Sequence, residues 1–177
     1  NWDTSNVTNI AFMFASASAF DQNIGNWNTS NITSMQSTFD STTAFNQNIG
    51  GWNTSSVENM EAMFANAGDF NQNINAWDTS KVNNMQEMFN EATSFNQDLS
   101  NWCVSNITSE PSNFSTSSAL SSSNKPLWGK EFTMSLSSGS QTQTVTATTA
   151  ITPIQYSVSS ICSGTISIGC LLYTSPS

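Results

Sequence analysis

Carboxylates are the side chains of this sequence that could do chemistry. Glu58 and Glu61 are three residues apart, and Glu87 and Glu91 are four apart, so each pair would share one face of a helix. Two carboxyl groups separated by about 5 to 10 Å can hydrolyse a glycosidic bond. Paired carboxylates on a polar helix face are, however, usually just solvated charges. We therefore expect no catalysis here, and keep an acid-pair glycosidase only as a third hypothesis.

The rest of the side-chain inventory argues against most other reactions. The 177 residues include 12 acidic residues, three Lys and no His. Without His there is no common general base to activate a Ser and no common metal ligand. A basic footprint for nucleic acid is also missing. We expect no enzyme activity, no cofactor, no metal site and no nucleic-acid partner, and no apolar run is long enough to span a membrane.

Apolar residues recur with a strict period. Aligned on Trp, the columns contain Val or Ile, then Met, Phe, Phe and Ile, and the Trp residues themselves are Trp2, Trp27, Trp52, Trp77 and Trp102. A fixed 25-residue period with aligned apolar columns is typical of a solenoid, in which stacked units share one core. We predict a five-coil solenoid over residues 1–109.

Each unit is predicted to hold one short helix and one short strand. Val57, Met60, Phe64 and Ala67 form a stripe with helical spacing. Thr54 and Ser55 precede the stripe, and Ser55 with Glu58 fits a capping box, so the helix should run from near Val57 to near Gly68. The strand is predicted over residues 73–77. The fold class is then an α/β repeat solenoid followed by a partial all-β segment.

Asn and Asp replace each other freely in the polar columns. One such column is Asp21, Asn46, Asn71 and Asn96, and it precedes a column of Gln. The shared feature is a side-chain oxygen and not a charge, which favours turn hydrogen bonds and ladders of stacked amides over a catalytic or calcium site.

The repeat resembles a known family. The stretches "WDTSNVTNIAFMFASASAFDQNIGNW" and "WDTSKVNNMQEMFNEATSFNQDLSNW" look like the unit of BspA-type leucine-rich-repeat-like bacterial surface proteins, over residues 1 to about 109. The resemblance implies an exported, right-handed, leucine-rich-repeat-like solenoid with an adhesive role and no catalytic residues.

The sequence after the repeats changes character. Pro111 interrupts the apolar stripe, and residues 110–132 are predicted to cap the core, with Trp128 covering the last aromatic rows. Residues 133–169 read as the start of a truncated immunoglobulin-like β-sandwich with strands in FTMSLSS, TQTVTATT and IQYSVSS; a Ser/Thr linker is the alternative. The ending over residues 170–177 resembles translated sequencing-adapter read-through, and we expect the chain to be an internal piece of a longer protein.

Two cysteines fall in different predicted modules. Cys103 lies in the last repeat and Cys162 in the β segment, while Cys170 belongs to the suspect ending. A disulfide between Cys103 and Cys162 is one alternative, and a partner for Cys162 in the missing part of its own truncated module is the other.

The predicted function is non-enzymatic binding. We expect a cell-surface or secreted structural or adhesive module that binds a protein or glycan on a host, neighbouring cell or matrix. The variable positions Lys81, Gln86, Glu87 and Asn90 are the candidate contacts. The alternative is a carbohydrate-binding module of a larger exported enzyme. The ten acids and one Lys of residues 1–100 give this part a net charge of −9, which repels anionic membranes.

Overall fold

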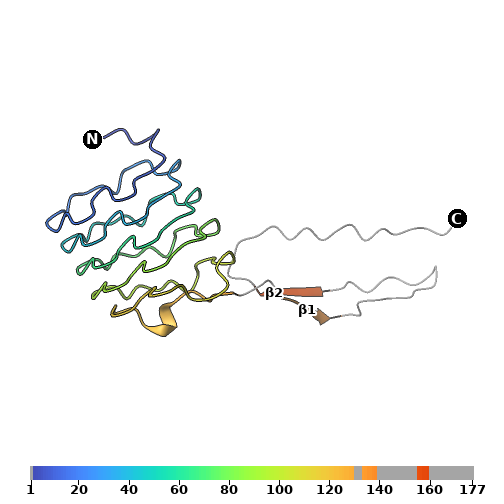
Figure 1. Cartoon of the computed structure of the whole chain (residues 1–177). Coiled ribbons are helices and arrows are strands. Elements are labelled where there is room, and N and C mark those ends of the chain that lie inside the picture. The colour runs from blue at the N-terminus through green and yellow to red at the C-terminus, as the bar shows by residue number, and fades with distance from the viewer. Residues whose placement is uncertain (1, 130–132, 139–154, 160–177) are drawn as a thin grey trace, which may run out of the picture.

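A computed structural model describes residues 2–129, 133–138 and 155–159 (Figure 1). Its named elements are the 3-10 helix η1 (Ser122–Asn124) and the strands β1 (Thr133–Ser138) and β2 (Gln155–Ser159). The two strands pair antiparallel, with Thr133 opposite Ser159 and Leu136 opposite Tyr156. They fall within two of the three stretches predicted to be strands, and the third stretch, residues 142–149, lies outside the described residues.

Successive 25-residue units lie on top of one another (Figure 1). We call residues 2–26, 27–51, 52–76 and 77–101 coils 1 to 4, and residues 102–129 the terminal coil. Isolated parallel bridges join equivalent residues of neighbouring coils, from Asn9 to Ser34, Asn59 and Asn84. Residues one period apart are therefore neighbours in space, and turns connect them around each coil.

The predicted α/β solenoid is wrong. Across the coils as described there is no α-helix, and no strand is longer than an isolated bridge. Regular secondary structure in the described residues is limited to η1, β1 and β2. Each coil is instead a closed series of turns.

The predicted helix over residues 57–68 fails for a backbone reason. Ala62 and Asn66 have φ angles of 49° and 55°, in the left-handed region that a right-handed helix does not contain. The N–H groups of Met60, Ala62, Phe64 and Asn66 donate to the next coil, whereas those of Met63, Ala65 and Ala67 donate to the third residue before them. The backbone N–H groups thus alternate between bonds to the next coil and bonds within the turn. The bonds to the fourth preceding residue that define an α-helix are absent from this stretch.

The predicted strand over residues 73–77 is a turn. The Asn73 side-chain oxygen accepts the Asn75 N–H at 3.0 Å, and residues 75–76 form the turn itself. This Asx turn redirects the chain before Trp77, so the stretch cannot continue as a strand.

The core is a set of stacked columns, as the repeat predicts. Trp52, Trp77 and Trp102 are at most 3% exposed, and consecutive rings stack with centroids 6.4 and 6.3 Å apart. Phe64 stacks on Phe70 within its coil at 4.0 Å and on Phe89 of the next coil at 5.7 Å. Burial of these columns between neighbouring coils replaces the core that a single 25-residue unit is too small to form.

The buried polar atoms of the columns form hydrogen bonds to backbone carbonyls of other coils. The indole Nε1–H of Trp77 donates to the Ile49 carbonyl, 28 residues earlier, at 3.1 Å. The buried hydroxyl of Thr54 donates to the Asp78 carbonyl of the following coil at 3.0 Å. Because the same bonds recur in neighbouring coils, they fix the register of the stack.

The hydrogen-bond register of the terminal coil is shifted by one residue over part of its length. Ala62 N–H donates to Gln86, 24 residues on, but Glu87 N–H donates to Ser112, 25 residues on. The shift begins before Ser112, close to Pro111, and has ended by Ser121, whose N–H bonds to the Asn96 side chain at the 25-residue spacing of the other coils. Phe114 is displaced by the change and meets Phe89 edge-on, at an interplanar angle of 87°.

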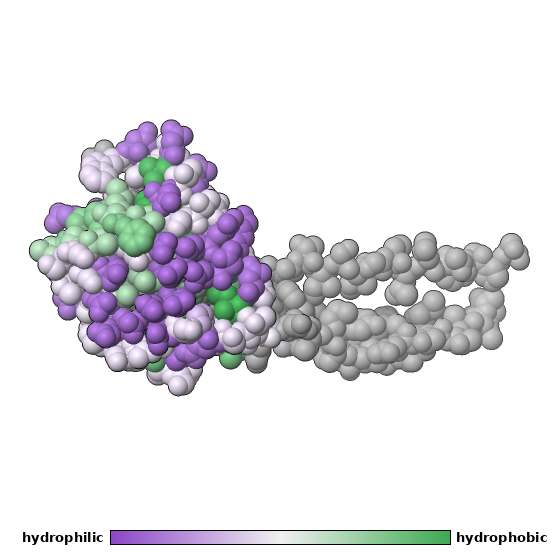
Figure 2. Space-filling view, in the orientation of Figure 1, coloured by the Kyte–Doolittle hydropathy of each residue, from purple (hydrophilic) through white to green (hydrophobic). Residues whose placement is uncertain are grey.

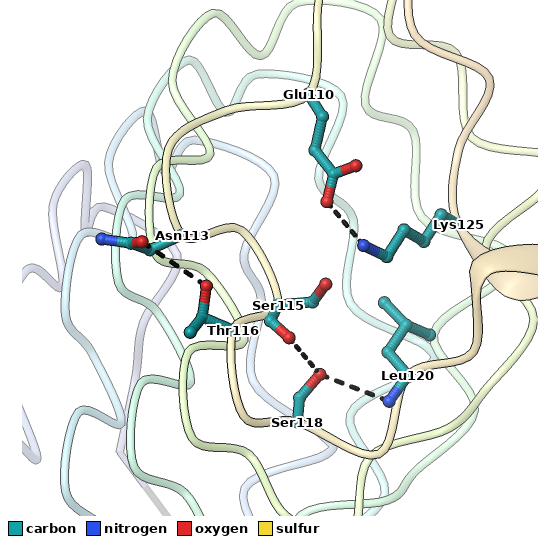
Figure 3. Close-up of polar contacts among 7 residues, drawn as sticks. All are labelled: Glu110, Asn113, Ser115, Thr116, Ser118, Leu120 and Lys125. Atoms are coloured by element: carbon teal, nitrogen blue, oxygen red, sulfur yellow. Dashed lines mark hydrogen bonds and ion pairs between the residues drawn. The ribbon is translucent and has the colours of Figure 1, made fainter.

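The end of the stack is covered by the segment after η1. Trp128 contacts Phe114 edge-on, with ring centroids 4.9 Å apart, so it covers the last Phe as predicted. Gly129 has a φ of 64°, and a Cβ there would lie 2.3 Å from the Thr108 carbonyl oxygen, so only glycine fits. Lys125 pairs with Glu110 at 2.6 Å, beside the turn formed by residues 112–117 (Figure 3).

Other predictions fall on residues that the structure does not describe. Cys103 is disulfide-bonded, but both Cys162 and Cys170 lie outside the described residues. The same holds for the predicted adapter-derived ending and for most of the predicted immunoglobulin-like module. The domain boundaries at 109, 132 and 169 stay predictions.

Candidate functional site

The carboxylate pairs are not arranged on helix faces. Glu87 and Glu91 both have positive φ angles, 59° and 57°, at the left-handed positions of their turns. Glu61 accepts a hydrogen bond from the Asn84 side chain of the next coil at 2.9 Å, while Glu58 is exposed. The geometric argument for a catalytic pair therefore no longer applies. Across the described coils and strands, no three His, Cys, Asp or Glu residues cluster as a metal site would require.

The four predicted contact residues lie in two places on coil 4. Gln86 and Glu87 are joined by a side-chain hydrogen bond of 3.3 Å, and the Asn90 N–H donates to the Glu87 carbonyl. Lys81 is exposed on an earlier turn, where its charge acts on Asp78. The structure thus groups three of the four residues and associates Lys81 with a different neighbour.

A depression lies between coil 4 and the terminal coil. It has a volume of about 320 Å³, and its lining is mainly amide and hydroxyl side chains: Asn83, Asn84, Gln86, Asn106, Thr108, Ser109 and Ser112, with Met85, Ile107 and Pro111 adding apolar surface. The depression lies where the register shift of the terminal coil begins, because Pro111 and Ser112 are part of its lining.

The depression also interrupts the hydrogen-bond ladder between coils. Glu58 and Asn83 each donate an N–H to the coil before them, and Met35 and Met60 each donate to the coil after them. Between coil 4 and the terminal coil, the equivalent groups are the Asn83 carbonyl and the Met85 N–H. Among the described residues, this carbonyl accepts no hydrogen bond and this N–H donates none. One rung of backbone pairing, with one donor and one acceptor, is therefore open at this site.

Amide side chains form a second ladder on the surface of the stack. The Asn71 side-chain oxygen accepts the Asn96 N–H at 3.1 Å and the Gln97 side-chain N–H at 2.8 Å. Asp21 accepts the same two bonds from Asn46 and Gln47 at the start of the column. The ladder explains why Asn and Asp alternate freely here, and it confirms the structural interpretation of this column.

Hydrogen bonds to aspartates lower their pKa values. The Ser80 and Ser100 side chains, followed by their backbone N–H groups, hold the pKa of Asp78 and of Asp98 below the ordinary value. The backbone N–H of Asn46 is the main cause of the lowered pKa of Asp21. These carboxylates are stabilised as anions that accept hydrogen bonds, and a proton donor for glycoside hydrolysis needs the opposite shift.

The sequence can now be placed among known proteins. A family model described as "Mycoplasma protein of unknown function, DUF285" matches residues 1–78 and, in a second match, residues 48–144. The chain belongs to this family. No curated protein and no solved structure matches it. DUF285 is a family of bacterial repeat proteins, and its description names neither a leucine-rich repeat nor an immunoglobulin-like module.

Sequence reasoning missed the open rung in this DUF285 chain. The available signal was Pro111, which stands one period after Gln86 and interrupts the apolar stripe. A proline at this position indicates a local change of backbone register in the terminal coil. In the described part of the chain, no helix is long and apolar enough to cross a membrane.

Proposed function

We propose that this chain is a non-enzymatic cell-surface or secreted binding module that recognises a protein partner. The open rung between coil 4 and the terminal coil is the observation that supports this function most directly. An extended peptide presents an N–H and a C=O in the arrangement that the neighbouring coils use at this rung. A partner segment could therefore donate an N–H to the carbonyl of Asn83, which is an exposed residue.

The surroundings of the open rung favour a protein ligand. Gln86, one of the predicted contact residues, lines the depression, and the amide and hydroxyl groups around it can pair with a peptide backbone. The coils themselves provide a rigid support, because the residues beneath the depression, such as Met85, are fully buried. The resemblance to BspA-type surface proteins also supports an exported, adhesive role.

Carbohydrate binding is the second candidate. The depression is rich in the amide and hydroxyl groups that bind sugar hydroxyls, which favours this alternative. Its lining contains no aromatic ring for a sugar to stack on, and the Trp and Phe residues of coils 2 to 4 belong to the core or pack against it. We therefore rank protein binding first.

A binding experiment separates the two candidates. The full chain would be tested by biolayer interferometry against immobilised extracellular-matrix proteins and, in parallel, against a glycan array. We expect saturable binding to at least one protein and none to the glycans. Ser109→Trp should obstruct the depression and reduce protein binding at least tenfold, and Gln86→Ala should weaken it.

Ser94→Trp is the matched control, because Ser94 is an exposed residue of coil 4 outside the depression. It should bind as the unchanged chain does. Binding only to glycans would favour the second candidate. Protein binding that survives Ser109→Trp would contradict the proposed site, and hydrolysis of a glycan that Glu61→Gln abolishes would contradict the non-enzymatic function.

A further inference from the structure

We propose that the depression between coil 4 and the terminal coil accepts an arginine side chain of the bound protein. This inference rests on the proposed function, in which the backbone of a partner segment pairs with the Asn83 carbonyl. It goes further because it names the residue that the segment carries. Three features support it: the carboxylates at the rim of the depression, the engagement of the nearby lysines elsewhere, and the apolar part of the lining.

Two carboxylates border the depression through the amides that line it. The Glu61 side chain accepts a hydrogen bond from the Asn84 side chain at 2.9 Å, and the Glu87 side chain accepts one from the Gln86 side chain at 3.3 Å. The Asn84 side-chain oxygen in turn accepts the Gln86 N–H at 3.1 Å, which holds this amide in one orientation. Each carboxylate has two oxygens, so each keeps acceptor capacity for a ligand.

No lysine of the described chain pairs with these two carboxylates. Lys125 pairs with Glu110 at 2.6 Å (Figure 3). Lys81 lies on an earlier turn, where its charge acts on Asp78. The negative charge at the rim is therefore uncompensated, and a cationic group of a partner would gain both Coulombic attraction and charge-assisted hydrogen bonds.

Apolar surface beside the carboxylates suits the stem of a long cationic side chain. Met85, Ile107 and Pro111 contribute this surface to a depression of about 320 Å³. Long cationic side chains bury their methylene groups on apolar surface and keep the charged head among polar groups. A bare metal ion would leave the apolar part of the lining uncovered, so the depression fits an amino-acid side chain better.

The presence of two separate carboxylates favours arginine over lysine. A guanidinium carries five N–H donors in a planar fork and can bond to more than one carboxylate at once. An ammonium carries three donors on one atom and is more strongly hydrated, so it costs more to bring into a depression. Arginine is also enriched at protein interfaces, whereas lysine is depleted there.

A peptide titration of the full chain tests the inference. The probe is acetyl-GSRSG-amide, compared with the same peptide carrying citrulline, lysine or glutamate at its centre. NMR should show saturable shifts of the N–H signals of Asn84, Gln86, Asn106 and Ser109, which line the depression, with the arginine peptide. The lysine peptide should bind more weakly. The citrulline and glutamate peptides should cause no such shifts, because they lack the positive charge.

Two double variants test the carboxylates themselves. Glu61→Gln with Glu87→Gln should weaken binding of the arginine peptide by about tenfold or more, because the charge-assisted hydrogen bonds are lost. A Gln at position 61 can still accept from Asn84, so the fold is retained. Asp69→Asn with Glu91→Gln is the matched control, since it removes the same net charge from exposed residues outside the lining. It should bind nearly as the unchanged chain does.

The outcomes separate this inference from the proposed function. If the citrulline peptide shifts the same signals as strongly as the arginine peptide, the depression binds peptide segments without a cation and the inference is wrong. Equal binding of the lysine peptide, or equal loss of affinity in the two double variants, would also overturn it. If no peptide shifts these signals, the inference fails, and the effect of Ser109→Trp on binding to matrix proteins decides the proposed function independently.

Discussion

At the scale of single residues, Asx side chains close the turns of each coil. The side-chain oxygens of Asn53 and Asp78 accept the N–H of the residue two positions on, at 3.0 Å in both cases. Because an amide and a carboxylate oxygen serve equally well as acceptors, the repeat tolerates both residues. Where the residue is Asp, the same bonds favour its anionic form and lower its pKa.

These lowered pKa values make stability depend on pH. Asp21, Asp78 and Asp98 have folded-state pKa values below their ordinary value of 3.8. Their contribution is therefore fully present above about pH 4 and is lost as the pH falls through the lowered values. The triple variant D21N/D78N/D98N should lose less stability than the unchanged chain between about pH 5 and pH 2, as measured by denaturant unfolding.

Ser80→Ala provides a control that acts through one bond. The Ser80 side chain is the largest cause of the lowered pKa of Asp78. NMR titration should therefore show a rise in the Asp78 pKa and no change for Asp21, which lies in coil 1. If the unchanged chain and the triple variant lost equal stability as the pH falls, the lowered pKa values would not be the cause of the pH dependence.

At the scale of elements, the Trp column ties neighbouring coils together. Trp52 is 3% exposed, stacks between Trp27 and Trp77, and donates to the Ile24 carbonyl. Trp52→Ala should reduce the free energy of unfolding by about 3 to 5 kcal/mol, as expected for truncation of a buried Trp. Chemical denaturation measures the loss.

Trp2→Ala is the matched control for this prediction. The same side chain is 65% exposed at the end of the column, so its truncation should cost less than about 1 kcal/mol. Trp52→Phe should fall between the two, because it keeps a ring in the column and loses the indole donor. Equal losses for Trp2→Ala and Trp52→Ala would mean that the column is not the core.

The sequence predicted which residues are buried better than it predicted the backbone. Val57, Met60, Phe64 and Ala67 are all fully buried, as the stripe requires. They are not helical. The same apolar spacing fits a series of turns, because consecutive turns also bring every third or fourth residue to the same side of the chain. The left-handed positions carry Phe12, Ser37, Ala62 and Glu87 in successive coils, so no glycine signals them.

The candidate site was only partly predictable for a related reason. Variability between coils identified Gln86, which lines the depression, but it could not show where a rung of the ladder is open. The open rung depends on a one-residue shift of the backbone register in part of the terminal coil, which residue types alone do not show. The polar columns were easier to predict, because each Asn or Gln bonds to its counterpart one period away.

At the scale of the whole molecule, the stack concentrates negative charge. Residues 1–100 carry ten acids and one Lys, so successive coils bring like charges close together along its length. Much of this surface is polar, as the purple areas of Figure 2 show. The repulsion opposes folding, and it disfavours any anionic partner at the depression.

This repulsion should make the chain more stable in salt. Raising NaCl from about 10 mM to 500 mM shortens the screening length to a few Å and should increase the free energy of unfolding by on the order of 1 kcal/mol. The control variant E58Q/D69N/E91Q removes three carboxylates that accept no hydrogen bond from the described residues, and it should respond less. NaCl is preferred to sulfate because sulfate also strengthens apolar burial. A salt response of equal size in both chains would show that burial, and not charge repulsion, governs how salt acts on the stack.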